Sequence, residues 1–175
     1  AYCMRFLEES GRAKMTNYSQ YLAMFPPEYE AEIVEASSWS CAHGIERWRS
    51  NCGCHTGGPG HWNQEWRVGL REALDWLSDQ FAEIFEREMS EYVDMPWNVR
   101  NKYIEVIFDR SAEMHERFVE EHTHKVMGAE DITRFNRLLE MQKHSMYMFT
   151  SCGWFFNDIS GIETVQILQY AARGI

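Results

Sequence analysis

Four side chains of the types that bind transition metals lie within fourteen residues of one another. They are Cys41, His43, Cys52 and Cys54, in the pattern C-x-H…C-x-C. Structural zinc takes four sulfur or nitrogen ligands in a tetrahedron, and nearby glycines let a short loop wrap around the ion. The ligand types and their number therefore predict a site that could hold a structural zinc ion. The spacing differs from the paired C-x-x-C of ordinary zinc ribbons, so this prediction rests on ligand count.

Other metal centres use overlapping sets of residues. His55, His61 and Cys152 are reserve ligands for the same ion. A set of four cysteines that includes Cys152 could instead hold an iron–sulfur cluster, although no standard spacing supports it. Haem attachment needs C-x-x-C-H, and this motif is excluded because one glycine alone separates Cys52 from Cys54.

The cysteines also have interpretations without a metal. Free cysteine is among the most buried residue types, so Cys41 and Cys152 could simply pack in the interior. A thiol beside an imidazole can act as a nucleophile, and Cys41 with His43, or Cys54 with His55, has the required residue types. Neighbours in sequence seldom point at each other, which makes the nucleophilic interpretation the weaker one.

A second unusual segment covers residues 148–161. Three consecutive aromatic residues, Trp154, Phe155 and Phe156, cannot all face one helical core, and Asn157 and Asp158 follow directly. Aromatic faces beside amide and carboxylate groups are typical of sugar recognition, because rings stack on the sugar and polar groups bind its hydroxyls. A helix end with its aromatics in the core and Asp158 near a cap is an equally good interpretation.

Most of the chain consists of stretches in which apolar residues recur every three to four positions, and this spacing predicts amphipathic helices. We expect helices over residues 2–9, 15–25, 28–36, 64–85, 96–118, 132–149 and 161–175. Asn63 and Asp94 are candidate N-caps, and Ser160 with Glu163 forms a capping box. The connections are short, which favours antiparallel neighbours.

Residues 37–62 interrupt this helical pattern. Four glycines and one proline between Gly53 and Gly60 are incompatible with a helix there. We therefore predict an all-α fold, an antiparallel bundle of about five to six helices, with an irregular Cys/His/Gly-rich insert near residues 37–62. A length of 175 residues suits a single domain spanning residues 1–175.

Composition argues against several classes of partner. The net charge is −10, so phosphate backbones and anionic membranes are disfavoured, and we expect neither a nucleic-acid nor a membrane partner. No apolar run approaches the roughly 20 residues of a membrane span. Five cysteines form an odd count that fits a reducing compartment, which predicts a cytoplasmic location. The helical pattern reaches both ends and Ala1 replaces an initiator Met, so we expect a piece of a longer protein.

Three segments carry a resemblance to a known family. They are residues 37–54, 63–67 and 152–161, which include SSWSCAHG, NQEWR and CGWFFNDISG. Nearly the whole chain resembles a helical family of unknown function that follows glycoside hydrolase family 57-like catalytic domains in one polypeptide. In family 57 a distorted barrel carries a Glu nucleophile and an Asp acid/base, and a helical bundle closes one side of the sugar cleft. This resemblance implies that an upstream barrel of the same polypeptide is the partner of the present chain.

The α-glucan branching enzymes of family 57 extend the comparison. They have a Ser-Trp-Gly segment leaving the barrel and a Ser-Asp-Trp motif that contacts substrate, and Ser38-Trp39 and residues 152–158 are similar to these. The second motif departs from the family pattern, because Trp154 follows Cys152-Gly153 and the carboxylate of Asp158 comes after the aromatics.

The resemblance implies that the chain is an accessory domain lining the sugar cleft of a family 57-like carbohydrate-active enzyme. Glycoside hydrolysis needs two carboxylates, and by the resemblance both lie upstream, so the chain alone would not be catalytic. The expected substrate-binding residues are Trp39, His43, Trp154, Phe155 and Asp158. The alternative hypothesis is a zinc-stabilised structural or protein-interaction domain without substrate contact, with Cys41, His43, Cys52 and Cys54 as ligands. Elemental analysis distinguishes the two.

Overall fold

The computed structural model describes residues 2–175. Contacts group the chain into two units, residues 1–35 and 36–175, and each is described by itself. In the first unit, helices α1 (Tyr2–Glu9) and α2 (Tyr18–Met24) contain no buried residue. Asn17 caps α2 by accepting a hydrogen bond from the Gln20 amide at 2.9 Å.

The prediction of a helix over residues 28–36 is wrong. These residues are irregular and exposed, and they follow Pro26 and Pro27. A segment this short needs an apolar face packed against another element, because isolated helices below roughly 12–15 residues are marginal in water. Residues 28–36 are exposed and have no such packing, so their helical spacing is not enough to form a helix.

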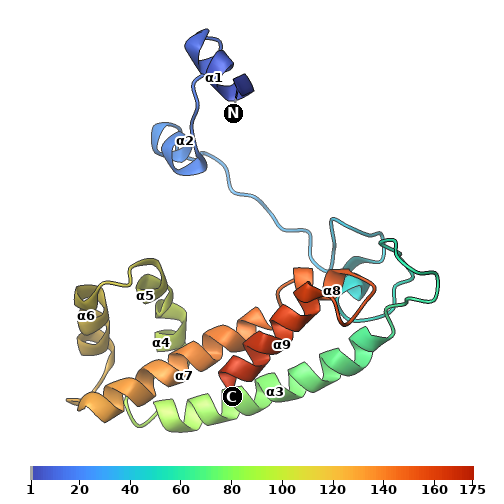
Figure 1. Ribbon diagram of the computed structural model, residues 1–175. Coiled ribbons are helices and arrows are strands. Elements are labelled where there is room, and N and C mark those ends of the chain that lie inside the picture. The colour runs from blue at the N-terminus through green and yellow to red at the C-terminus, as the bar shows by residue number, and fades with distance from the viewer. Residues whose placement is uncertain (1) are drawn as a thin grey trace. The chain divides into compact units, whose positions relative to one another are not determined.

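The second unit is built from helices joined by short connections (Figure 1). Their bounds are η1 (a 3-10 helix, Gly44–Trp48), α3 (Trp66–Met89), α4 (Pro96–Lys102), α5 (Ile104–Phe108), α6 (Ala112–His122), α7 (Ala129–Tyr147), α8 (Cys152–Phe155) and α9 (Ile162–Gly174). The described residues contain helices and no strand. The all-α class and the irregular insert are thus confirmed.

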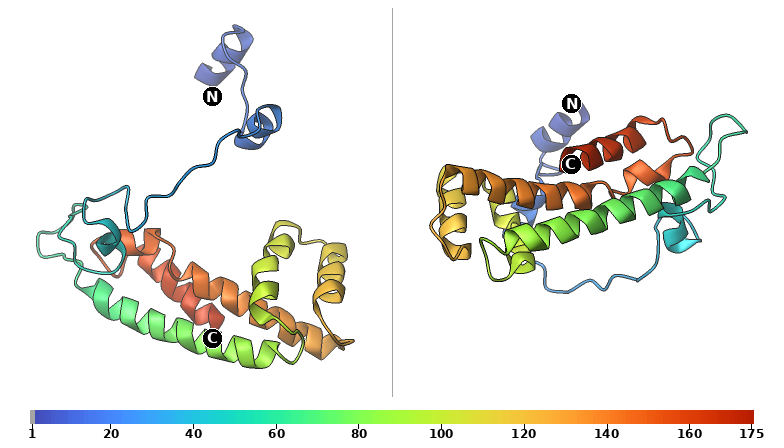
Figure 2. Two further views of the ribbon diagram at one scale, coloured as in Figure 1. Left: turned by 180° about the vertical axis from the view of Figure 1, so that it is seen from behind. Right: turned by 90° about the horizontal axis from the view of Figure 1, so that it is seen from below.

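Three of these helices form the framework. Helix α7 runs back antiparallel along α3, and α9 packs on both of them (Figures 1 and 2). The single helix expected over residues 96–118 is divided into α4, α5 and α6. One break is a turn in which Asp109 accepts from the amide of Ser111, and Ser111 then caps α6 by accepting from the Met114 amide. Such side-chain bonds compete with helix continuation.

Two hydrophobic cores lie along this framework. The larger is built around Phe85, Met89, Phe118 and Phe135, where α3 and α7 meet α4–α6. The smaller holds Leu74, Met148, Trp154, Ile167 and Ala171 and lies between α3, α8 and α9. Gly153 is required in the smaller core because a Cβ there would overlap the side chain of Ile167. This second core is the platform against which the Cys/His-rich insert packs.

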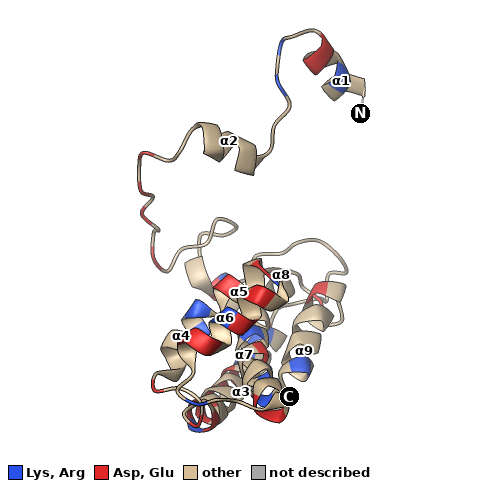
Figure 3. Cartoon of the chain, turned by 90° about the vertical axis from the view of Figure 1, so that its left-hand side faces the viewer, with Lys and Arg blue, Asp and Glu red and all other residues tan. Residues whose placement is uncertain are grey.

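The surface carries charges of both signs. Acidic and basic residues are interspersed along α3–α7 (Figure 3). Among the described helices, none is both long and apolar enough to cross a membrane.

Candidate metal centre

The four predicted ligands converge in the irregular segment before α3. Gly44 follows His43 with a positive φ of 60°, and a side chain there would collide with the carbonyl oxygen of Ala36. Gly53 has a φ of 78°. This left-handed conformation, which favours glycine, turns the chain so that Cys52 and Cys54 face the same point. Backbone conformation, rather than regular structure, positions these ligands.

The arrangement has the dimensions of a tetrahedral metal site. The Sγ atoms of the three cysteines and a ring nitrogen of the histidine all lie within 4.8 Å of one another; the residues are Cys41, Cys52, Cys54 and His43. His43 Nδ1 is 3.7 Å from Cys41 Sγ and 3.5 Å from Cys54 Sγ. Bond lengths of about 2.3 Å for Zn–S and 2.0 Å for Zn–N imply a tetrahedral N···S edge of about 3.5 Å. The two N···S distances are close to this value, so the cluster could bind a metal ion.

A fully buried arginine lies beside the cluster. The Arg67 guanidinium donates to the Ser50 carbonyl at 3.2 Å and lies 3.9 Å from Cys52 Sγ. Its other terminal nitrogen donates to the carbonyl of Phe155 at 2.8 Å, while its Nε has no partner. Arg67 has 0% exposure, so its charge depends on these neighbours rather than on water.

Arg47 is the second buried cation at this site. It is 2% exposed, donates to the carbonyl of Cys54 at 3.4 Å, and lies 4.1 Å from the ring centre of Phe155. In the described part of the chain, neither Arg47 nor Arg67 pairs with a carboxylate. Buried charges are normally paired. The nearby groups that can supply negative charge are the cysteine thiols.

The arginines favour the metal-binding form of one thiol. Burial raises the pKa of Cys52, but hydrogen bonds from the Cys54 amide and the Arg47 guanidinium outweigh burial, so the pKa lies below its ordinary value. Burial, followed by the neighbouring thiol of Cys41, raises the pKa of Cys54. Since the thiolate is the metal ligand, two positive charges next to the cluster lower the cost of deprotonating it.

Polar side chains from two other elements tie the cluster to the framework. Gln64, before α3, donates to the carbonyl of Cys54 and to Asn157 Oδ1, the latter at 2.6 Å. Asn157, after α8, donates to the Gly57 carbonyl at 2.8 Å. Gln64 and Asn157 are 2% and 3% exposed. Both sides of the insert are therefore held by satisfied, buried hydrogen bonds.

The reserve ligands lie outside the cluster. Cys152 is exposed on α8, so the four-cysteine set needed for an iron–sulfur centre is not brought together. His55 contacts Asn157, the Gly57 amide and the Trp62 carbonyl instead. Its imidazole helps to hold the loop and is not among the four converging ligand atoms.

The structure corrects the expectation for Trp154. This residue is 1% exposed and its ring is stacked between Trp66, at 6.2 Å, and Phe149, at 6.4 Å. Its Nε1 donates to the carbonyl of Met148 at 3.3 Å. Because the side chain is buried, Trp154 offers no face to a sugar and is a core residue.

The remaining expected sugar contacts differ in their surroundings. Trp39 is 88% exposed and stacks on Phe155, with ring centres 6.2 Å apart and planes 13° from parallel. Asp158 binds the amide and hydroxyl of Ser160 in a turn, and this hydrogen bonding lowers its pKa. His43 belongs to the Cys/His cluster. Trp39 with Phe155 is the aromatic surface that remains accessible.

Sequence reasoning did not identify the residues that support the cluster, namely Arg47, Gln64, Arg67 and Asn157. The sequence does contain a signal for one of them. Arg67 is three residues before Leu70 and seven before Leu74, so it falls on the apolar face of α3. A charged residue at a core position predicts a buried ionic partner.

Comparison with known protein families matches residues 62–175 to a family described as "Domain of unknown function (DUF3536)". The match covers about two thirds of the chain, from the end of the glycine-rich loop through α9. It includes Arg67 and Asn157 but not the four converging ligands. Neither curated proteins nor solved structures gave a match.

Proposed function

Since the chain belongs to the family described as Domain of unknown function (DUF3536), we propose a function from its structure. The proposal is that the Cys/His cluster is a structural zinc site that fastens residues 36–65 onto the ends of α3 and α8. The observation that carries the proposal is the convergence of three thiols and one imidazole, from Cys41, Cys52, Cys54 and His43, with two N···S distances close to the edge of a zinc tetrahedron.

Electrostatics supports the same proposal independently. Three thiolates around Zn²⁺ carry one net negative charge, and this charge would lie against Arg47 and Arg67. Without an anion at the cluster, two buried guanidinium groups would lack a countercharge, which costs several kcal/mol per unpaired ion. The two arginines therefore fit a metal–thiolate cluster better than they fit three neutral thiols.

A structural role follows from the number of ligands. Four protein ligands complete the tetrahedron, whereas catalytic zinc keeps a position open for water or substrate. Zinc at this site would therefore supply crosslinking rather than Lewis-acid chemistry. The five free cysteines of the described residues fit a reducing, cytoplasmic location, which we propose as well.

Elemental analysis of protein purified without a metal-affinity tag tests the zinc proposal. We expect one zinc per chain in the wild type and less than about a tenth of that in Cys54→Ser, because three ligands bind zinc much more weakly than four. His43→Cys should retain zinc, since four cysteines also form a tetrahedral site, whereas His43→Ala should lose it.

His61→Ala is the matched control, because His61 is exposed and lies outside the cluster. Its zinc content should equal that of the wild type. Wild-type protein that is folded and free of zinc, iron and other transition metals would overturn the proposal.

We propose a second function for the aromatic surface beside the cluster: it lines the sugar cleft of a family 57-like enzyme whose catalytic barrel lies upstream. The proposal rests on the sequence resemblance and on one structural observation. Trp39 is a large aromatic side chain left 88% exposed while it stacks on Phe155. An exposed aromatic ring of this kind is suited to stacking on a sugar.

The sugar-cleft proposal is tested in the parent polypeptide that contains the barrel. Trp39→Ala should weaken affinity for an α-glucan by about tenfold, which corresponds to about 1.4 kcal/mol, while the zinc content stays unchanged. Trp76→Ala is the control, because Trp76 is 63% exposed but lies on α3. Unchanged glycan affinity in Trp39→Ala would exclude this role for the aromatic surface.

A further inference from the structure

The three thiols of the Cys/His cluster are not equivalent. Cys52 lies on the buried side of the cluster, where its Sγ is 3.6 Å from Gln64 Oε1 and 3.9 Å from the Arg67 guanidinium. Gln64 and Arg67 are 2% and 0% exposed. Cys52 is therefore the thiol that is held against the framework.

Cys41 and Cys54 form the outer side of the same cluster. Each Sγ contacts Nδ1 of His43, at 3.7 Å from Cys41 and 3.5 Å from Cys54. His43 is exposed, and both cysteines are only partly buried. Two thiols that meet at one exposed imidazole can be reached by a small molecule from the solvent.

The distances within the cluster allow the two outer thiols to join. All four ligand atoms lie within 4.8 Å of one another, and a disulfide brings its sulfurs to about 2.05 Å. The chain after η1 is irregular over residues 49–54 and turns at Gly53, so the backbone can follow a shift of this size. A bridge that used Cys52 would instead have to give up the contacts of that thiol with the framework.

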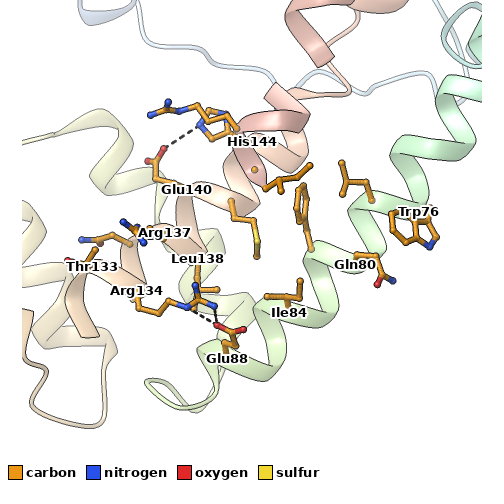
Figure 4. Close-up of a pocket in the computed structure, with 17 residues that line it drawn as sticks. Trp76, Gln80, Ile84, Glu88, Thr133, Arg134, Arg137, Leu138, Glu140 and His144 are labelled. Atoms are coloured by element: carbon orange, nitrogen blue, oxygen red, sulfur yellow. Dashed lines mark hydrogen bonds and ion pairs between the residues drawn. The ribbon is translucent and has the colours of Figure 1, made fainter. Parts of the chain in front are cut away.

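The framework does not depend on the cysteines of the cluster. The other cysteine of the second unit is Cys152, which is exposed on α8 and lies outside the cluster. Helices α3 and α7 are joined by the larger core and by an ion pair between Glu88 and Arg134 (Figure 4). A chemical change at the cluster would therefore act on the insert and leave these contacts in place.

We propose that Cys41 and Cys54 are a peroxide-sensitive pair whose oxidation to a disulfide expels the metal from the cluster. The inference rests on the proposed zinc site and adds its regulation. One thiolate sulfur attacks a peroxide oxygen, the O–O bond breaks, hydroxide leaves and a sulfenic acid forms. The second sulfur attacks this sulfenic sulfur, the S–S bond forms and a second hydroxide leaves. Two protons from solvent convert the hydroxides to water, so the two sulfurs lose the two electrons that the peroxide gains.

Release of the metal follows from the loss of two ligands. The thiolate is the form of cysteine that binds metal, so a disulfide between Cys41 and Cys54 leaves His43 and Cys52 alone at the site. Two protein ligands fall short of the four that hold a structural zinc ion. Reduction of the disulfide by a small thiol would restore the set, because thiol–disulfide exchange is reversible.

The test uses the full chain with Cys3→Ser/Cys152→Ser, two substitutions at exposed positions that leave the cluster thiols as the remaining cysteines. The protein is treated with hydrogen peroxide in slight excess. We expect one zinc ion to be released per chain, detected with a chromogenic chelator, and a disulfide between Cys41 and Cys54, located by proteolysis and mass spectrometry. Dithiothreitol followed by zinc should restore the metal content.

Two further variants in this background compare the thiols, with chelator present throughout so that zinc content does not differ. Cys52→Ser keeps both outer thiols and should form the disulfide within about threefold of the parent rate. Cys41→Ser also removes one cluster cysteine but breaks the pair, so disulfide formation should slow by at least about tenfold.

The outcomes separate this inference from the zinc site on which it rests. Zinc that stays bound through peroxide treatment, or a bridge that includes Cys52, would overturn the inference while the zinc site stands. Equal rates for Cys41→Ser and Cys52→Ser would overturn it as well. Untreated protein without zinc would contradict the zinc site and with it the release of metal, whereas the rates in chelator would still decide which thiols form the pair.

Discussion

Removal of the proposed zinc ion should unfold residues 36–65 and leave α3, α7 and α9 helical. The insert has little regular structure and is held by the Cys/His cluster and by hydrogen bonds from Gln64 and Asn157. The framework helices instead bury the apolar residues of two cores. On the zinc proposal, chelation would therefore remove the main crosslink of the insert and leave the contacts that hold the framework together.

The expected loss of stability on chelation depends on the ratio of free zinc to its dissociation constant. Zinc at a thousandfold excess over its dissociation constant stabilises the folded chain by about 4 kcal/mol. In a chain of this length each kcal/mol corresponds to about 2–4 °C, so chelation should lower the melting temperature by about 8–16 °C. Hydrogen exchange should show lost amide protection in residues 36–65 and retained protection in α3 and α7.

Re-addition of zinc, but not of magnesium, should restore both the melting temperature and the protection, because thiolate and imidazole ligands suit zinc. Cys54→Ser should resemble the chelated wild type before any chelator is added. Complete removal of zinc with unchanged exchange in residues 36–65 would contradict a crosslinking role, even if elemental analysis had found the ion.

Trp154→Ala should have the second largest effect, lowering the free energy of unfolding by about 3–5 kcal/mol. The side chain is 1% exposed, stacks between Trp66 and Phe149, and fills the core beneath the insert. Truncation removes this packing and leaves a cavity that the rigid ends of α3 and α9 close only in part. Urea titration followed by circular dichroism measures the change.

The same titration of Trp76→Ala provides the comparison, because Trp76 is 63% exposed and belongs to neither core. Its free energy of unfolding should change by less than about 0.5 kcal/mol. Equal effects of the two substitutions would mean that Trp154 does not support the core as its burial indicates.

The helical class could be predicted because α3 and α7 carry long apolar stripes that bury against each other. Residues 28–36 show the limit of that signal: the spacing is helical, but no partner surface buries it. Similarly, residues 96–118 continue the apolar pattern while Asp109 and Ser111 form side-chain bonds that end one helix and begin another. Periodicity indicates which face can be buried, whereas tertiary packing and local side-chain bonds to the backbone decide where a helix forms and where it ends.

The candidate site was predicted to the extent that its chemistry lies close in sequence. Cys41, His43, Cys52 and Cys54 are distinctive residue types in one short segment, and they do converge. Asn157 is 102 residues from His55, its partner in the structure, so no local pattern could connect them. Trp154 shows a different limit, since three consecutive aromatics do not reveal which ring enters the core.

The two buried arginines bear on how this site can change in evolution. Arg47 and Arg67 are tolerable beside the cluster because thiolates can offset their charge. A relative that lost the cysteines but kept both arginines would have two buried cations without a countercharge. Ligand and arginine positions should therefore be inherited or replaced together, so that Arg67 on the apolar face of α3 marks relatives that keep the site even where their loop sequences differ.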